Sequence, residues 1–375
     1  MNELFSVDGR VFSPQRPLVI AELGTSHRAG PDRAKEMADA AAQAGADCVK
    51  TQMVFADEIL HPNTGEAPLP GGSIRLYDRF KTLEAPPEFY RDLKEYVESL
   101  GLLFLCTPFG LKSAGILRGL GPKMVKIASP ELNFTALLRE IAGWGLPILL
   151  SSGVSTLADI DEALSITKTC ENSGQNSGKI CLLHCVTSYP APETDFNLRV
   201  LRSLQAVFGV SVGLSDHSPA PELVPALAVS QGAAVIEKHF CLSETGGGLD
   251  DPIALSPPLF ARMVKAVREA AEAGPEAVMA KYIRERGKAY VEAVLGTGIK
   301  ELAPSERANY RRTNRSIHAM RDIRRGETIG PGDFAVLRTE KKLRPGLEPR
   351  WEPLIAGRTA RDFIPAGEGI RFGDI

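Results

Sequence analysis

Eight short apolar runs, rich in β-branched residues, recur through the first two thirds of this 375-residue chain. Runs of this kind, bounded by turn-forming residues, are typical of buried strands. Most neighbouring runs are separated by helical patterns, such as DRAKEMADAAAQAGA and PPEFYRDLKEYVESLG, whose glycines suit a left-handed helix cap. The runs are LVIAEL from residue 18, DCVKTQ from 47, LLFLC from 102, KMVKIA from 123, PILLSS from 147, ICLLHC from 180, VSVGLS from 210 and AVIEKHF from 234. This eightfold alternation predicts an α/β fold of the (β/α)8 TIM-barrel type, with a doubly wound open sheet as the alternative.

The composition argues against several classes of protein. With 43% hydrophobic and 24% charged residues, the chain can bury a large core. A formal net charge of -2 gives no field that favours nucleic acid or an anionic membrane. The opening MNELFSVDGRVFS lacks a basic segment followed by an apolar one, and no run approaches the roughly 18 apolar residues of a spanning helix. We therefore expect a cytoplasmic protein that binds neither nucleic acid nor membrane.

The last quarter of the chain has a different pattern. From Gly274 to about Tyr310 the apolar periodicity weakens and the charge rises, which suggests an exit helix and a linker. Beyond it, short strand-like pieces such as SIHAMRDI and DFAVLR are punctuated by Gly and Pro. We expect a barrel domain over residues 1–280, a linker over 281–312 and a small β-rich domain over 313–375.

Each predicted strand ends in, or leads to, polar residues. Catalytic groups of a TIM barrel come from the carboxyl ends of several strands, so this recurrence predicts an active site at that rim. The residues are Glu22, Lys50, Gln52, Thr107, Lys126, Ser129, Glu131, Ser151, Ser152, Thr187, Tyr189, Ser215, Asp216, His217, Lys238 and His239.

Two of these residues are lysines in otherwise apolar strands. Burying Lys50 and Lys126 unpaired would be costly, so an anionic partner is expected. With the hydroxyls of Thr107, Ser129 and Ser151 they could bind a phosphate group. The alternative is that each lysine pairs with a carboxylate of the barrel.

Two histidines, His217 and His239, each follow a predicted strand. Both strands end at the same edge of the sheet, which would bring the imidazoles to one rim. With Glu22, Glu131 or Asp250 nearby, they would form a divalent metal site that leaves positions open for water and substrate. Two core histidines that bind backbone carbonyls are the alternative.

Nine sequence motifs occur in order along nearly the whole chain. They are VIAELGTSHRAG, DCVKTQ, CTPF, VKIASPE, LLSSGVST, LLHCVTSYPAPETDFNL, VGLSDHS, VIEKHF and GGGLDDPIALSP. Together they resemble the sialic acid synthase family, which makes nine-carbon nonulosonic acids. The tail after TNRSIHAMRDIRRGE resembles that family's C-terminal antifreeze-like (SAF) domain, which is of the β-clip type.

The resemblance implies a transferase that condenses phosphoenolpyruvate with an N-acetylated amino sugar similar to N-acetylmannosamine. Carbon 3 of the enol would attack the open-chain aldehyde, water would add to carbon 2, and phosphate would leave by C–O cleavage. The resemblance also implies a divalent metal, Mn²⁺ or Mg²⁺. It further implies a domain-swapped homodimer in which the SAF domain reaches over the barrel mouth of the other subunit.

The resemblance also implies a role for each site residue. The phosphoenolpyruvate-binding residues would be Lys50, Thr107, Lys126, Ser129, Ser151, Thr187 and Ser215. The metal would be held by His217 and His239, and the sugar by Gln52, Tyr189, Asp250 and Arg315, with a contact from Glu22. Catalysis would involve Glu22 and the two histidines, with Glu131 activating or positioning the attacking water.

Two departures from the family's motifs leave the acceptor sugar open. SHRAG stands where NHNG is usual, and ASPELN has PE where GE is common; ASPE and GGGLDD are closer to pseudaminic acid synthases. The acceptor could therefore be N-acetylmannosamine or a 6-deoxy diacetamido hexose, as in pseudaminic or legionaminic acid synthesis. Two other functions remain as alternatives: a class I aldolase with Lys126 or Lys238 as a metal-free Schiff base, and a non-catalytic sugar-binding protein.

Overall fold

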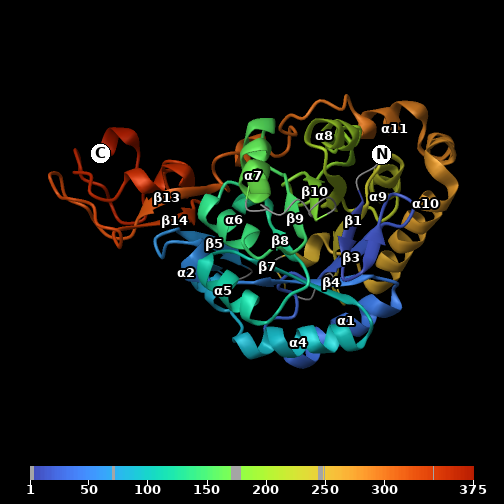
Figure 1. Ribbon diagram of the computed structural model, residues 1–375, viewed down its shortest axis with the longest axis horizontal. Coiled ribbons are helices and arrows are strands. Elements are labelled where there is room, and N and C mark those ends of the chain that lie inside the picture. The colour runs from blue at the N-terminus through green and yellow to red at the C-terminus, as the bar shows by residue number, and fades with distance from the viewer. Residues whose placement is uncertain (1–3, 70–71, 170–178, 244–247, 249, 341) are drawn as a thin grey trace.

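An eight-stranded parallel barrel forms the centre of the molecule (Figure 1). The computed structural model describes residues 4–69, 72–169, 179–243, 248, 250–340 and 342–375. The barrel strands are β3 (Leu18–Glu22), β4 (Cys48–Met53), β7 (Leu103–Pro108), β8 (Val125–Ile127), β9 (Ile148–Ser151), β10 (Ile180–Cys185), β11 (Ser211–Asp216) and β12 (Val235–His239). Their order is β7-β4-β3-β12-β11-β10-β9-β8, and β7 lies beside β8, so the barrel is nearly closed. Each strand overlaps one of the eight apolar runs, which confirms the predicted TIM barrel.

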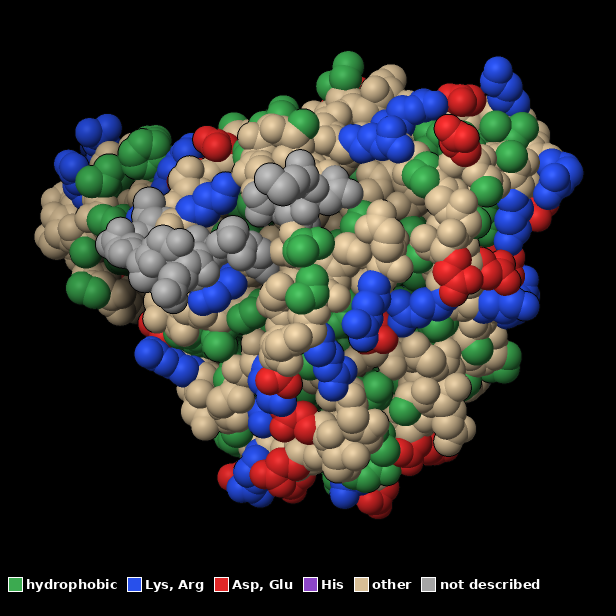
Figure 2. All heavy atoms as spheres, turned by 45° about the vertical axis from the view of Figure 1, so that its right-hand side comes forward, with side chains coloured by type: hydrophobic (Ala, Val, Ile, Leu, Met, Phe, Trp, Pro, Cys, Tyr) green, Lys and Arg blue, Asp and Glu red, His purple; other side chains and the backbone are tan. Residues whose placement is uncertain are grey.

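Helices surround the barrel (Figure 1). Helix α4 illustrates why they form: Pro87 occupies its first turn, and Phe89, Tyr90, Leu93 and Val97 give it one apolar face that is buried. The helices are α1 (Pro31–Gln43), α4 (Pro87–Ser99), α5 (Leu111–Gly119), α6 (Thr135–Ala142), α7 (Leu157–Thr169), α8 (Val200–Phe208), α9 (Leu223–Ser230) and α10 (Pro257–Arg286). No helix in the described part of the chain combines the length and the apolar composition that a membrane span requires. On the face that Figure 2 shows, basic and acidic side chains are interspersed among apolar and other ones.

Alternate residues of each strand point into the barrel, and this inward set changes from apolar to polar along the strand. In β12 the inward residues are Val235, then Glu237, then His239. At the amino end the hairpin of β1 (Phe5–Val7) and β2 (Arg10–Phe12) packs Phe5 and Phe12 against the apolar members of the set. The barrel is therefore plugged by apolar side chains at one end and lined by polar ones at the other.

The C-terminal domain lies beside an excursion of the chain that follows β4 (Figure 1). The excursion contains α2 (Ala56–Ile59), β5 (Glu66–Leu69), β6 (Gly72–Arg75) and α3 (Leu76–Lys81). The domain contains the antiparallel pair β13 (Arg315–Ala319) and β14 (Phe334–Arg338), with the 3-10 turns η5 (Pro349–Leu354) and η6 (Phe372–Asp374). The amide of Asn63 donates to the carbonyl of Ala366 (3.0 Å), which ties the excursion to the domain.

The chain between the barrel and this domain is partly helical. The expected linker, residues 281–312, contains the end of α10, all of α11 (Lys288–Leu295) and the 3-10 turn η4 (Arg307–Asn309). Helix α10 is kinked at Gly274, whose φ of 79° lies outside the helical region, and Pro275 follows it. Three further 3-10 turns, η1 (Ser129–Glu131), η2 (Glu193–Asp195) and η3 (Asp251–Ile253), follow barrel strands.

Candidate active site

A cavity of about 230 Å³ opens at the carboxyl ends of the barrel strands. Its wall contains ten of the residues predicted for the site: Lys50, Gln52, Lys126, Ser129, Ser151, Tyr189, Ser215, His217, His239 and Asp250. These residues come from six strands and the loops that follow them, so only the closed barrel brings them together. Of the residues to which the family resemblance gives a role, five are not part of this wall: Glu22, Thr107, Glu131, Thr187 and Arg315; the rim residues Ser152, Asp216 and Lys238 are not part of it either.

Three of the predicted hydroxyl groups are buried and make no hydrogen bond in the described structure. They belong to Thr107, Ser151 and Thr187. A buried hydroxyl without a partner costs free energy, so these groups are suited to a polar ligand or to water. Ser129 differs, because its hydroxyl accepts a hydrogen bond from the backbone N–H of Gly153 (3.0 Å).

The two cavity lysines pair with carboxylates of the barrel, as the second interpretation of their sequence allowed. Lys50 Nζ lies 2.5 Å from Glu22 Oε2 and 3.3 Å from Glu237 Oε1, and Lys126 Nζ lies 3.4 Å from the same Glu237 oxygen. That oxygen also accepts a hydrogen bond from Ser215 (3.0 Å). Both ammonium groups are thus already paired, so an anionic ligand that binds here has to share them with Glu22 and Glu237.

Glu237 is a site residue that the sequence analysis missed. Burial would raise the pKa of its carboxyl, but the ammonium groups of Lys126 and Lys50 outweigh burial and lower it to about 2. Glu22 and Glu237 likewise offset the effect of burial on Lys50 and raise its pKa. The period of two along a strand could have identified Glu237, because it lies two residues before His239 and so faces the same interior.

The two histidines lie side by side in the cavity wall. Their ring centroids are 5.5 Å apart, and the ring of Tyr189 lies 4.3 Å from that of His217. The Nδ1 of His217 is 2.8 Å from the carbonyl oxygen of Val186, which can only accept, so the N–H is on Nδ1 and a neutral ring keeps the lone pair on Nε2. The Nδ1 of His239 lies 3.8 Å from Asp250 Oδ2.

The imidazoles differ in their charge state. Burial would lower the pKa of His217, but the adjacent Cys185 and the Val186 carbonyl raise it to about 8. Burial lowers the pKa of His239 to about 3, despite the nearby carboxylate of Glu22. Among the described residues no third His, Cys, Asp or Glu completes a metal-binding cluster with them. A metal ion at this place would therefore have two imidazole ligands from the described chain, with its other positions left to water and substrate.

A fully buried ion pair supports the backbone beside both histidines. Lys238 Nζ lies 2.7 Å from Asp216 Oδ2 and also donates to the backbone carbonyl and the hydroxyl of Ser218. Asp216 directly precedes His217, and Lys238 directly precedes His239. The pair therefore ties β11 to β12 at the point where each strand presents its imidazole. Neither Lys238 nor Asp216 is part of the cavity wall.

Glu131 and Arg315 lie together behind the cavity wall. Arg315 Nε donates to Glu131 Oε1 (2.9 Å), and both side chains are completely buried. The rest of the Arg315 guanidinium donates to the backbone carbonyls of Glu58, Phe109 and Val336. A second arginine, Arg338 of β14, donates to the same oxygen of Glu131 through Nε and Nη2 (2.9 and 2.6 Å) and does reach the cavity. Within this chain, Arg338 is the arginine of the C-terminal domain that lines the barrel cavity, and the predicted contact of Arg315 with the sugar stays a prediction.

Comparison with known proteins supports both parts of this architecture. The model of the NeuB family matches residues 37–279, and that of the SAF domain matches residues 314–375. The crystal structure of the spore coat polysaccharide biosynthesis protein SpsE from Bacillus subtilis is similar, with a TM-score of 0.81 and 32% identity over 99% of each chain.

Two related sequences carry names of synthases. The N,N'-diacetyllegionaminic acid synthase of Campylobacter jejuni is 32% identical over 86% of this chain and 91% of the relative. The pseudaminic acid synthase of Helicobacter pylori is 30% identical over 96% of this chain and 98% of the relative. With a TIM barrel, a polar cavity at its carboxyl rim and a C-terminal SAF domain, the chain belongs to the NeuB family.

Proposed function

We propose that this protein condenses phosphoenolpyruvate with an N-acetylated hexose to give a nonulosonic acid and phosphate. The observation that supports this most directly is the content of the barrel cavity. Two ammonium groups, the guanidinium of Arg338, three serine hydroxyls and two imidazoles line one space of about 230 Å³, together with the carboxylates of Glu237, Asp250 and Glu340. Cations and short hydroxyl donors suit the phosphate and carboxylate of the donor, and the imidazoles stand beside them.

The residues of the cavity would divide the work between the two substrates. Lys50, Lys126 and the serines would bind phosphoenolpyruvate so that carbon 3 of its enol faces the sugar aldehyde. Gln52, Tyr189 and Asp250 would contact the sugar, which places the reacting carbons together. Water then adds at carbon 2, and the C–O bond to phosphate breaks. Of the three carboxylates in the cavity wall, Glu237 pairs with lysines and Glu340 with Arg338, whereas Asp250 lies beside His239; burial raises the pKa of Asp250, as suits a group that accepts a proton.

The two imidazoles would hold the divalent metal, Mn²⁺ or Mg²⁺. When bound, such an ion polarises a carbonyl oxygen and so makes the aldehyde a better electrophile. His217 would use Nε2, because its Nδ1 N–H points at the carbonyl of Val186. That hydrogen bond fixes the orientation of the ring, and the Lys238–Asp216 pair fixes the backbone beside it.

Metal affinity should increase with pH up to about 8. Binding requires the lone pair of His217, whose pKa is raised to about 8, so below this pH a proton competes with the metal. Each pH unit below the pKa should weaken the affinity about tenfold. Titration of the metal-free protein with Mn²⁺ between about pH 6 and pH 9 would measure this dependence. An affinity that stays constant over this range would show that His217 does not carry the displaced proton.

The positions of Lys238 and Lys126 give little support to the alternative function of a Schiff-base aldolase. Lys238 lies outside the cavity wall and its ammonium group has three hydrogen-bond acceptors. Lys126 is in the wall but shares Glu237 with Lys50. Borohydride trapping in the presence of substrate would detect a Schiff base if one formed. The domain-swapped homodimer and the cytoplasmic location stay predictions.

The function is tested by measuring phosphate release from phosphoenolpyruvate with a panel of N-acetylated hexoses, with and without Mn²⁺. The panel contains N-acetylmannosamine and the 6-deoxy diacetamido hexoses, because the relatives differ in the acid that they make. We expect one acceptor to support turnover well above the rate without sugar, and chelation to remove it. Absence of phosphate release with every sugar in the presence of metal would contradict the proposal.

A further inference from the structure

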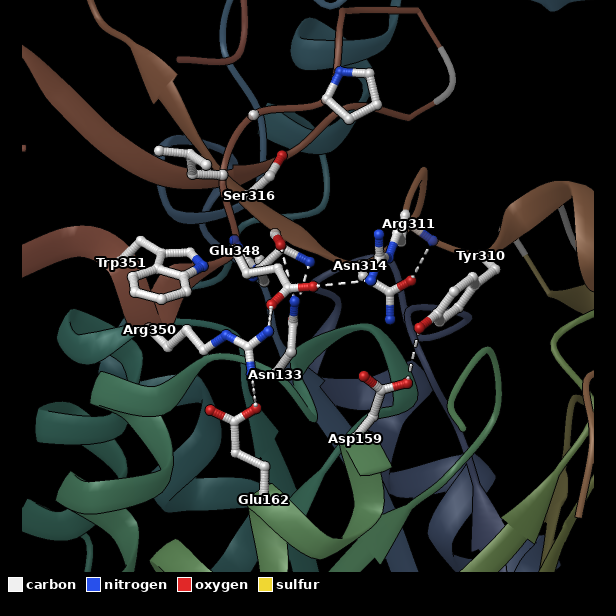
Figure 3. A pocket seen from close by; sticks show the side chains of 14 residues that line it. Asn133, Asp159, Glu162, Tyr310, Arg311, Asn314, Ser316, Glu348, Arg350 and Trp351 are labelled. Carbon is white, nitrogen blue, oxygen red and sulfur yellow. Dashed lines mark hydrogen bonds and ion pairs between the residues drawn. The ribbon is translucent and has the colours of Figure 1, made fainter. Parts of the chain in front are cut away.

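A second cavity, of about 520 Å³, lies between the barrel and the C-terminal domain (Figure 3). Its barrel side is formed by the start of α7, with Asp159 and Glu162, and its other side by Glu348, Arg350 and Trp351 of the C-terminal domain. We call this space the interdomain cleft. It shares no wall residue with the barrel cavity, and its volume is within the range of small-molecule sites.

The cleft is lined by charged groups that already pair with one another (Figure 3). Arg350 bridges Glu162 (3.1 Å) and Glu348, which also accepts from Arg311 (3.2 Å). The cleft wall contains three carboxylates, those of Asp159, Glu162 and Glu348. Only two guanidinium groups of the described wall face them, those of Arg311 and Arg350, because the guanidinium of Arg315 is directed at Glu131. An entering anion would therefore meet an excess of like charge, and an entering cation would have to compete with arginines.

The paired groups still leave hydrogen-bonding atoms open to a ligand. The hydrogen bonds of Asp159, including the one from the hydroxyl of Tyr310 (3.1 Å), all end on Oδ2, and Glu162 uses Oε2. The other oxygen of each carboxylate can accept from a ligand hydroxyl. The side chains are also accessible, with 46% of Arg350 and 39% of Glu162 exposed.

One wall of the cleft is apolar. The indole of Trp351 lines it, with the guanidinium of Arg350 over one part of its ring (5.5 Å to the centroid), and makes an edge-to-face contact with Phe372, with ring centroids 5.5 Å apart. An aromatic surface beside planar polar side chains suits a molecule with an apolar face and many hydroxyl groups. A purely apolar ligand would instead leave the charged groups of the opposite wall desolvated.

We propose that the interdomain cleft is a second binding site, separate from the barrel cavity, for a neutral, hydroxyl-rich ligand of the sugar class. Such a ligand would bridge Glu162 of α7 and Arg350 of η5, and so would link the two domains. The backbone of Arg315 borders the cleft and its guanidinium holds Glu131, which also holds Arg338 in the wall of the barrel cavity. A chain of buried contacts through Arg315, Glu131 and Arg338 therefore runs from one site to the other.

Trp351 provides a direct test, because it is one of only two tryptophans in the chain. In a Trp144→Phe variant all tryptophan emission comes from Trp351. We expect a saturable change of this emission with N-acetylglucosamine or maltose, and none with glucuronate, which is charged. Glu162→Ala should weaken the affinity about tenfold, since it removes a charged acceptor. Asp161→Ala, an exposed carboxylate on the same helix but outside the cleft, should leave the affinity unchanged.

Calorimetric titration of the unaltered chain and of Glu162→Ala with the same sugars gives the result without any tryptophan change. Absence of binding by both methods overturns the proposal. Binding of glucuronate alone overturns the neutral class of ligand. Binding that is lost in a His217→Ala variant but kept in Glu162→Ala places the sugar in the barrel cavity instead. None of these measurements depends on turnover. The phosphate-release assay can therefore contradict the proposed synthase activity without contradicting this binding site, and these measurements can contradict the site without contradicting the activity.

Discussion

Turnover should be lost when either His217 or His239 is replaced by alanine, while the fold remains. His217 and His239 are the two imidazoles of the barrel cavity wall, so each substitution leaves a single imidazole there. Replacing a residue that only hydrogen-bonds to a metal ligand lowers metal affinity about 10- to 100-fold. Replacing the ligand itself should lower the affinity at least as much. Phosphate release, metal content and thermal unfolding of each variant would measure the three effects.

His184→Gln is the matched control for these two variants. His184 is also a buried strand-end histidine, but it contacts the backbone carbonyl of Phe196 (2.6 Å) and is not part of the cavity wall. Its replacement should leave metal content unchanged. Full activity of His217→Ala or His239→Ala after exhaustive chelation would show that the reaction does not use a metal at this pair.

Arg315→Ala should lower the free energy of unfolding by about 3–5 kcal/mol, because it breaks a buried ion pair. The substitution removes one of the two partners of Glu131 and leaves the carbonyl of Phe109 without this donor. The expectation from the family resemblance was different: there Arg315 contacts the sugar, and its loss would damage mainly the use of the acceptor. Chemical unfolding and the KM for each substrate, measured on the same variant, separate the two roles.

Arg118→Ala is the control for this second prediction. Arg118 also pairs with a glutamate, Glu140 (3.3 Å), but its side chain is 61% exposed, so its loss should cost no more than about 1 kcal/mol. If Arg315→Ala raises the KM for the sugar and leaves unfolding unchanged, the anchoring role is wrong. Glu131→Gln tests the other half of the pair: it should also lower stability, because both arginines lose their carboxylate, and a rate loss of about 10²- to 10⁴-fold beyond that of Arg315→Ala would indicate a base.

The barrel and most of the residues in its cavity could be predicted from local patterns along the chain. Apolar runs of strand length, repeated eight times between helical patterns, leave few arrangements that bury every run. Since parallel strands end at one rim, the polar residue that closes each run also had to reach that rim. Lys50, Lys126, His217 and His239 met in one cavity for this reason. Both the strand pattern and the position of each strand end are local properties of the chain.

The pairing of these groups with one another could not be predicted, because it depends on contacts between distant segments. Glu237 reaches both lysines because β12, β4 and β8 curve around one interior, and neither contact follows from spacing along the chain. The same holds for Glu131, which meets Arg315 and Arg338 from 184 and 207 residues away. The interdomain cleft likewise exists only because the barrel and the C-terminal domain dock against each other. Such contacts depend on barrel closure and on domain docking, which are set by the packing of distant surfaces rather than by any local pattern.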